Sequence, residues 1–293
     1  MIPSDVLKQI RRIEIRTSHR VDDMLAGRYH SAFKGRGMAF EEVRPYAAGD
    51  DVRAIDWNVT ARAGDPYIKL FREERELSVI LLVDLSASQS IGSGQQSKRQ
   101  LVTELGATLA FSAIRNQDKV GFVGFTDEIE KIVPVGKGSR HVLRVIRELL
   151  YCQPVGQGTD LTRALEHLNR SAKRRSVVFL ISDFQDVGYD IPLRIAKRKH
   201  DIIPIVIHDE REEQLPNVGL IELLDIETGK TMLVDSSNAE HRRCFAQRVS
   251  ERWTKRDQLF RQLKMDPILL QAGEDFIDPL RRFFDKREAR QCR

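Results

Sequence analysis

Hydroxyl and carboxylate side chains follow an apolar run of the sequence. Asp84, Ser86 and Ser88 come directly after residues 79–83, which are all apolar. Their spacing of i, i+2 and i+4 allows the three side chains to turn toward one point, because Asp and Ser favour tight turns. The residue types and their spacing therefore predict a cluster of oxygen atoms at the end of a buried strand.

Two further oxygen-bearing residues lie at comparable points of the chain. Thr159 comes just before an expected helix over 160–170, and Asp183 directly follows an apolar strand expected over 176–182. In open α/β sheets, ligands bind at the carboxyl ends of strands, near the point where the strand order reverses. We therefore expect all five side chains to meet at one edge of a sheet.

Two carboxylates and three hydroxyls form a set of hard oxygen ligands. Such a set suits Mg²⁺ or Mn²⁺, with water completing the coordination shell, and is a poor match for zinc or copper. The turn at Asp84 could also be a helix cap, but the addition of Thr159 and Asp183 favours a metal site. Two negative charges leave such a cation a residual positive field, which would attract one more carboxylate from outside.

Apolar strands alternate with helices from Leu77 onward. This alternation predicts an α/β fold, with a doubly wound, mostly parallel sheet covered on both faces. We expect the strand order 3-2-1-4-5-6, with the third strand antiparallel at one edge. The expected strands span residues 77–84, 119–125, 128–135, 176–182, 202–207 and 267–270. The expected helices span residues 98–115, 140–150, 160–170, 190–199, 238–264 and 275–288.

Two segments depart from this alternation. Residues 219–235 predict a β-hairpin that projects as an insertion from the α/β domain of residues 77–290. Residues 1–76 have too few apolar positions for a large core, so we expect a small N-terminal segment packed on that domain. Within it we expect a helix over 4–25 and two strands, over 40–46 and 67–71.

The oxygen cluster resembles a known site. Asp84, Ser86 and Ser88 match the DxSxS part of the metal-ion-dependent adhesion site of von Willebrand factor A domains. Thr159 and Asp183 match the threonine and the distal aspartate of that site, in the same order. The resemblance implies a Rossmann-like fold, a bound Mg²⁺ or Mn²⁺, and a protein partner that supplies an acidic residue to the metal.

The segment from Gly49 to Arg62 carries a second resemblance. It is similar to a stretch in bacterial proteins of unknown function whose genes neighbour those of MoxR-type AAA+ ATPases. This resemblance implies that the partner is such an ATPase or its client, and that the chain is an adaptor or is chaperone-like. The residues concerned are Gly49, Asp50, Arg53, Asp56, Trp57 and Arg62. They could form a partner-facing surface, or lock the N-terminal segment onto the sheet through a buried ion pair and an aromatic anchor.

The alternative function is an enzyme, a Mg²⁺-dependent phosphatase or phosphotransferase of Rossmann-like fold. Haloacid-dehalogenase-type enzymes also place an acidic loop after the first strand, and they use a DxD motif with one Asp as nucleophile and the next as acid/base. Ser86 stands where the second acid would be, so the sequence favours a binding module without catalytic residues.

Composition excludes several other classes. The net charge of +5 is spread along the chain, which does not favour nucleic-acid binding. No stretch approaches the ~20 apolar residues that span a bilayer, and no signal peptide is visible. Cys152, Cys244 and Cys292 are far apart, which excludes a disulfide framework and suits a reducing compartment. We therefore expect a cytoplasmic protein.

Overall fold

The computed structural model describes residues 28–29, 32–33, 38–73, 77–90, 97–209, 212–224 and 229–291. Contacts divide the chain into two compact units. The α/β unit contains the described residues up to Ala32 together with Ser78 onward, and the small unit is Phe33–Leu77. The helix expected over 4–25 lies outside the described residues. Tyr29 belongs with the α/β unit because its ring packs edge-on against Phe284, with ring centroids 5.8 Å apart.

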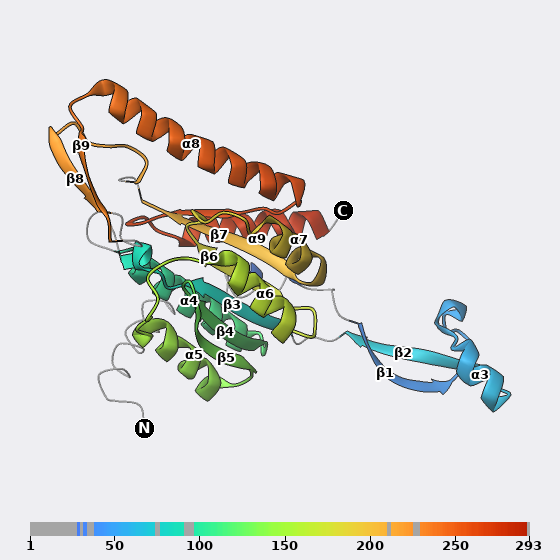
Figure 1. The fold of residues 1–293 in the computed structure, drawn as a ribbon. Helices are drawn as coiled ribbons and strands as arrows, with labels where there is room; N and C mark the ends of the chain where they lie inside the picture. The colour runs from blue at the N-terminus through green and yellow to red at the C-terminus, as the bar shows by residue number, and fades with distance from the viewer. Residues whose placement is uncertain are drawn as a thin grey trace. The chain divides into compact units, whose positions relative to one another are not determined.

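A six-stranded sheet forms the centre of the α/β unit (Figure 1). Its strands are β3 (Ser78–Asp84), β4 (Lys119–Phe125), β5 (Ile129–Gly136), β6 (Val177–Ser182), β7 (Asp201–His208) and β10 (Ile268–Gln271). The spatial order is β10-β7-β6-β3-β4-β5, with β5 antiparallel to β4 and the other neighbours parallel. Counted along the chain, this is the expected order 3-2-1-4-5-6, so the fold class is confirmed.

Helices flank this sheet (Figure 1). They are α4 (Lys98–Arg115), α5 (Ser139–Tyr151), α6 (Leu161–Ser171), α7 (Asp190–Lys199), α8 (Ala239–Gln262) and α9 (Ile277–Gln291). On one face, Leu82 of β3 packs in a buried cluster with Leu165 of α6 and Leu193 of α7. Helices α4 and α5 pack against each other and both contact β4. A strand covered on both faces must be apolar at every position, which explains the unbroken apolar run of β3.

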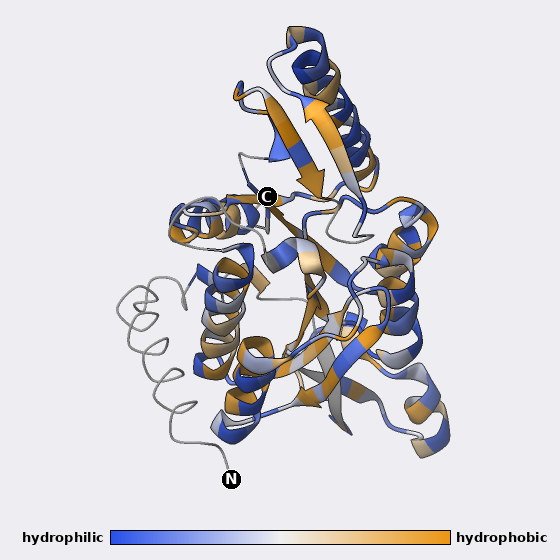
Figure 2. Ribbon diagram, turned by 60° about the vertical axis from the view of Figure 1, so that its left-hand side comes forward, coloured by the Kyte–Doolittle hydropathy of each residue, from blue (hydrophilic) through white to orange (hydrophobic). Residues whose placement is uncertain are grey.

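The hairpin insertion is present as expected. Among the strands that the structure describes, β8 (Leu220–Leu224) and β9 (Thr231–Asp235) pair only with each other, antiparallel, and stand apart from the central sheet (Figure 2). The hairpin exposes several large apolar side chains, and Leu220 and Leu233 are each 69% exposed. Among the helices in the described part of the chain, none has the length and apolar character needed to cross a bilayer.

The small unit is a two-stranded antiparallel sheet with two short helices between its strands. Strands β1 (Met38–Pro45) and β2 (Tyr67–Glu73) enclose the 3-10 helix η1 (Val52–Ala54) and the α-helix α3 (Trp57–Ala63). The segment from Gly49 to Arg62 forms this connection. The segment is therefore the helical connection between two antiparallel strands of the small unit.

Candidate metal centre

The carboxyl ends of β3 and β6 meet at the point where the strand order reverses. The two strands are parallel neighbours, with Val83 opposite Ile181. Strand β3 lies between β4, the next strand along the chain, and β6, so the strand order reverses at β3. Asp84 ends β3 and Asp183 follows the last residue of β6, so parallel pairing places both acids at one edge.

Hydroxyl groups surround the Asp84 carboxylate. The Ser86 backbone N–H donates to Asp84 Oδ1 at 2.9 Å, and the Ser182 hydroxyl donates to Asp84 Oδ2 at 2.8 Å. The Ser86 and Ser88 hydroxyl oxygens lie 2.9 Å apart, at the start of the 3-10 helix η2 (Ala87–Ser90). The turn predicted from the i, i+2, i+4 spacing therefore brings its three oxygen-bearing side chains together.

Asp183 lies on a turn with an unusual backbone. The next residue, Phe184, has φ of 57°, in the left-handed region that a residue with a Cβ rarely adopts. The Phe184 N–H donates to the Ser182 hydroxyl at 3.1 Å, and its ring packs edge-on against Phe260 at 5.2 Å. Such strained positions persist only where the surroundings hold them, and they cluster at functional sites. Packing of Phe184 thus fixes the Asp183 carboxylate at the sheet edge.

The loop that carries Thr159 reaches the same edge. Ala87 in η2 donates its N–H to the Gln157 carbonyl at 3.1 Å, and Asp160 donates its N–H to the Thr126 carbonyl at 3.0 Å. Thr159, between these two tethers, is half-buried. The structure therefore places the loops of all five predicted ligands at one edge.

Burial and charge perturb Asp84. Its side chain is 1% exposed, and burial raises its pKa from 3.8 to about 7, assisted by the nearby charge of Asp183. The hydrogen bonds from Ser86 and Ser182 oppose this rise. Two carboxylates forced together in a buried site repel each other, and a divalent cation between them would relieve that repulsion.

The donor set fits a hard divalent cation. The neighbouring Gln89 amide is 1% exposed, and neither its nitrogen nor its oxygen has a hydrogen-bond partner among the described residues, so an unused polar group adjoins the site. No group of three or more His, Cys, Asp or Glu side chains in the described ranges could hold a metal. Binding here would depend on the hydroxyls of Ser86, Ser88 and Thr159 as well as on the two carboxylates.

Three neighbours of the site were not identified from the sequence. Ser182 donates to Asp84, and Lys98 at the start of α4 lies with its Nζ 3.8 Å from Asp183 Oδ2. Glu212 accepts a hydrogen bond from Lys98. One signal was available for Lys98, because it precedes Leu101 and Leu105 at helical spacing and so falls on the buried face of α4.

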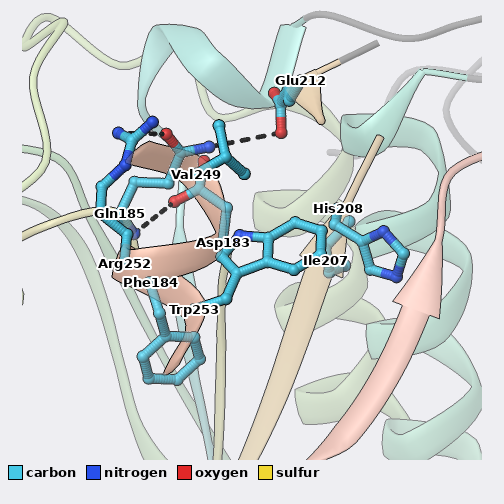
Figure 3. Close-up of a pocket in the computed structure, with 9 residues that line it drawn as sticks. All are labelled: Asp183, Phe184, Gln185, Ile207, His208, Glu212, Val249, Arg252 and Trp253. Carbon is cyan, nitrogen blue, oxygen red and sulfur yellow. Dashed lines mark hydrogen bonds between the residues drawn. The ribbon is translucent and has the colours of Figure 1, made fainter. Parts of the chain in front are cut away.

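A pocket adjoins Asp183 on the side of α8 (Figure 3). His208 at the end of β7 packs edge-on against Trp253 of α8, with ring centroids 5.7 Å apart. The lining residues are Asp183, Phe184, Gln185, Ile207, His208, Glu212, Val249, Arg252 and Trp253. The cavity therefore shares Asp183 with the candidate metal centre and includes Ile207 and His208 at the carboxyl end of β7.

The acids of the Gly49–Arg62 segment support its local structure. Asp50 forms two hydrogen bonds with the Arg44 guanidinium, both at 2.7 Å. Asp56 caps α3 by accepting from the backbone of Asn58 at 3.0 Å, and pairs with Lys69 at 3.2 Å. These contacts hold the connection between β1 and β2 in place.

The remaining residues of the segment face outward. Trp57 is 68% exposed. Arg53 and Arg62 are also exposed, and Gly49 has a φ of 110° that requires glycine. The segment thus combines acids that hold its own fold with a tryptophan and two arginines on the surface.

We expect Gly156→Ala to weaken metal binding without contacting the metal. A Cβ at Gly156 would lie 2.1 Å from Asp127 Oδ1 and 2.3 Å from Thr126 Oγ1, so these two side chains or the loop carrying Thr159 must shift. Mn²⁺ titration calorimetry should show an affinity about tenfold lower, as misplacement of one of several ligands implies. The matched control is Gly158→Ala in the same loop, where a Cβ would make only ordinary contacts, the nearest 3.7 Å from Asp127 Cβ. If Gly156→Ala binds Mn²⁺ with unchanged affinity, this loop does not contribute to the metal site.

The solved structures that are similar to this chain have low sequence identity to it. BatB from Bacteroides thetaiotaomicron, described as a conserved hypothetical protein, is 16% identical with a TM-score of 0.48, over 73% of this chain and 99% of that one. A von Willebrand factor type A structure from Catenulispora acidiphila is 12% identical with a TM-score of 0.41, over 75% and 44%.

Sequence relatives are closer. An uncharacterized protein of Mycobacterium bovis and one of Mycobacterium tuberculosis are each 32% identical over 223 residues, which is 75% of this chain and 70% of the relative. The model of the family described as "Protein of unknown function DUF58" matches residues 42–255, which include Asp84, Asp183 and most of the small unit. The chain therefore belongs to the DUF58 family.

Proposed function

We propose that the chain is a non-catalytic, metal-dependent protein-binding module. Mg²⁺ or Mn²⁺ would be held by Asp84, Ser86, Ser88, Thr159 and Asp183, and would bind an Asp or Glu from a partner protein. The observation that carries the proposal is the convergence of two buried carboxylates and their hydroxyl neighbours where the strand order reverses.

The charge of the site supports a carboxylate as the outside ligand. Mg²⁺ requires about six ligands, and three of the five proposed protein ligands are neutral hydroxyls. A cation held by two carboxylates keeps a favourable interaction with a third. When bound, the cation would supply positive charge and a free coordination position for the partner. The chain supplies the oxygen ligands and, through the left-handed turn at Phe184, holds Asp183 in place.

The partner that we propose is a MoxR-type AAA+ ATPase or a client of that ATPase. The resemblance of the Gly49–Arg62 segment supports this assignment, and the ATPase would hydrolyse ATP while this chain acts as adaptor or chaperone-like factor. Exposed Trp57, Arg53 and Arg62 give the small unit a second surface for the same partner.

Binding to a purified MoxR-type ATPase from the same organism tests the proposal. We expect the immobilised chain to retain the ATPase in Mg²⁺ or Mn²⁺, to release it in EDTA, and to retain it again when Mn²⁺ is restored. Asp84→Ala, Ser86→Ala and Thr159→Ala should each weaken the complex at least about tenfold, as loss of a metal ligand implies.

The control is Asp278→Ala, which makes the same chemical change at an exposed position of α9, in the α/β unit. A complex that is equally strong in EDTA and with Asp84→Ala would assign binding to another surface and overturn the metal dependence. Mg²⁺-dependent release of phosphate from a phosphomonoester that is lost with Asp84→Ala would favour the phosphatase alternative.

A further inference from the structure

A buried lysine lies beside the candidate metal centre. Lys98 has 0% exposure, although lysine is almost never fully buried unless its charge is paired. Its Nζ lies 3.8 Å from Asp183 Oδ2 and donates a hydrogen bond to Glu212 Oε1. The Lys98 ammonium therefore forms an ion pair with Asp183, one of the proposed metal ligands.

Glu212 is itself held next to Asp183. Gln185 bridges the two acids: its side-chain amide donates to Glu212 Oε2 at 3.3 Å, and its backbone N–H donates to Asp183 Oδ1 at 3.2 Å (Figure 3). Glu212 thus offers Lys98 a second carboxylate within reach. Lys98 can keep a charged partner while its contact with Asp183 is lost.

We infer that Lys98 competes with the divalent cation for Asp183 and so sets a low metal affinity, an inference that rests on the proposed function. Without metal, the ammonium satisfies both Asp183 and Glu212. With metal, two positive charges cannot both approach one buried carboxylate, so Lys98 keeps only its bond to Glu212. The free energy gained when the cation binds its ligands is then reduced by the free energy needed to separate Lys98 from Asp183.

Replacing Lys98 by Met tests this competition, because Met fills a similar volume without the charge. We expect Lys98→Met to bind Mn²⁺ about tenfold or more tightly in titration calorimetry, since like charges near 4 Å repel strongly in a protein interior. We also expect the metal-free variant to unfold at a lower temperature, because Asp183 and Glu212 lose their counter-charge. Added Mn²⁺ should raise its unfolding temperature more than that of the wild type.

A double variant separates direct competition from a general effect of charge. Lys98→Met with Glu212→Gln removes one positive and one negative charge, so the net charge of the site equals that of the wild type. Competition for Asp183 predicts that this double variant still binds Mn²⁺ more tightly than the wild type. Lys173→Met, at an exposed position before β6, is the control for loss of a lysine charge far from this edge.

Each outcome decides between the claims. If the wild type binds Mn²⁺ through Asp84 and both Lys98 variants bind with the same affinity, the competition is overturned and the proposed function stands. If Lys98→Met is tighter but the double variant equals the wild type, Lys98 acts only through its field and the competition is again overturned. If neither the wild type nor any variant binds Mn²⁺, the proposed metal-dependent function fails and the competition fails with it.

Discussion

Asp84→Ala should abolish Mn²⁺ binding while leaving the protein folded. Asp84 is one of the two charged ligands in the proposed set and accepts hydrogen bonds from the Ser86 backbone N–H and the Ser182 hydroxyl, so its loss removes a charge and the acceptor of both bonds. We expect the affinity in titration calorimetry to fall at least about 100-fold, as loss of a charged ligand implies.

Two measurements make the Asp84→Ala result decisive. Circular dichroism and thermal unfolding should show that the variant keeps its fold, because Ala is tolerated at the end of a covered strand. Asp278→Ala, the exposed control in α9, should bind Mn²⁺ like the wild type. If Asp84→Ala and the wild type bind Mn²⁺ with equal affinity, the cation lies elsewhere and this site assignment is refuted.

Asp84→Asn should stabilise the metal-free protein at pH 8. Burial raises the pKa of Asp84 from 3.8 to about 7. The folded state therefore disfavours the ionised acid, and this cost is absent below about pH 4 and complete above about pH 8. One pKa unit corresponds to about 1.4 kcal/mol, so ionised Asp84 destabilises the fold by on the order of 4 kcal/mol.

Asparagine removes this charge at nearly constant shape. Its oxygen can still accept from the Ser86 N–H, and its amide can donate to the Ser182 hydroxyl. Chemical denaturation without metal should show the Asp84→Asn variant more stable than the wild type by about 2–4 kcal/mol at pH 8, with the difference shrinking toward pH 5. Comparing variant with wild type at each pH cancels other titrating groups, such as His200, whose pKa burial lowers to about 4. A difference that is constant from pH 5 to pH 8 would show that Asp84 is not the titrating group.

Local sequence signals predicted the elements of the α/β unit well. Helix α4 was expected over 98–115 and has those bounds, because Ser97 caps its start by accepting from Gln100 and Asn116 ends it. Strands β3 and β6 are predictable because both of their faces are covered, which makes their central positions an unbroken apolar run. The turn at Asp84 was predicted because Asp and Ser form their hydrogen bonds within a few residues.

Interactions between distant parts of the chain were not predictable in the same way. Lys98 contacts Asp183 and Glu212 only after α4, β6 and the segment after β7 have packed, and no local pattern specifies that meeting. The strained turn at Phe184 likewise depends on Phe260 of α8.

The pairing of β3 with β6 also fixes when the site can exist during synthesis. Asp84 and Ser182 form their hydrogen bond across 98 positions of sequence, and the strands β4 and β5 are made in between. A ribosome-bound chain that has exposed Asp84 but not yet β6 lacks Asp183, the second of the two charged ligands in the proposed set. Cation capture must then wait until β6 has emerged and inserted beside β3. Free Mg²⁺ or Mn²⁺ would therefore stabilise the completed sheet, and would not stabilise folding intermediates that lack β6.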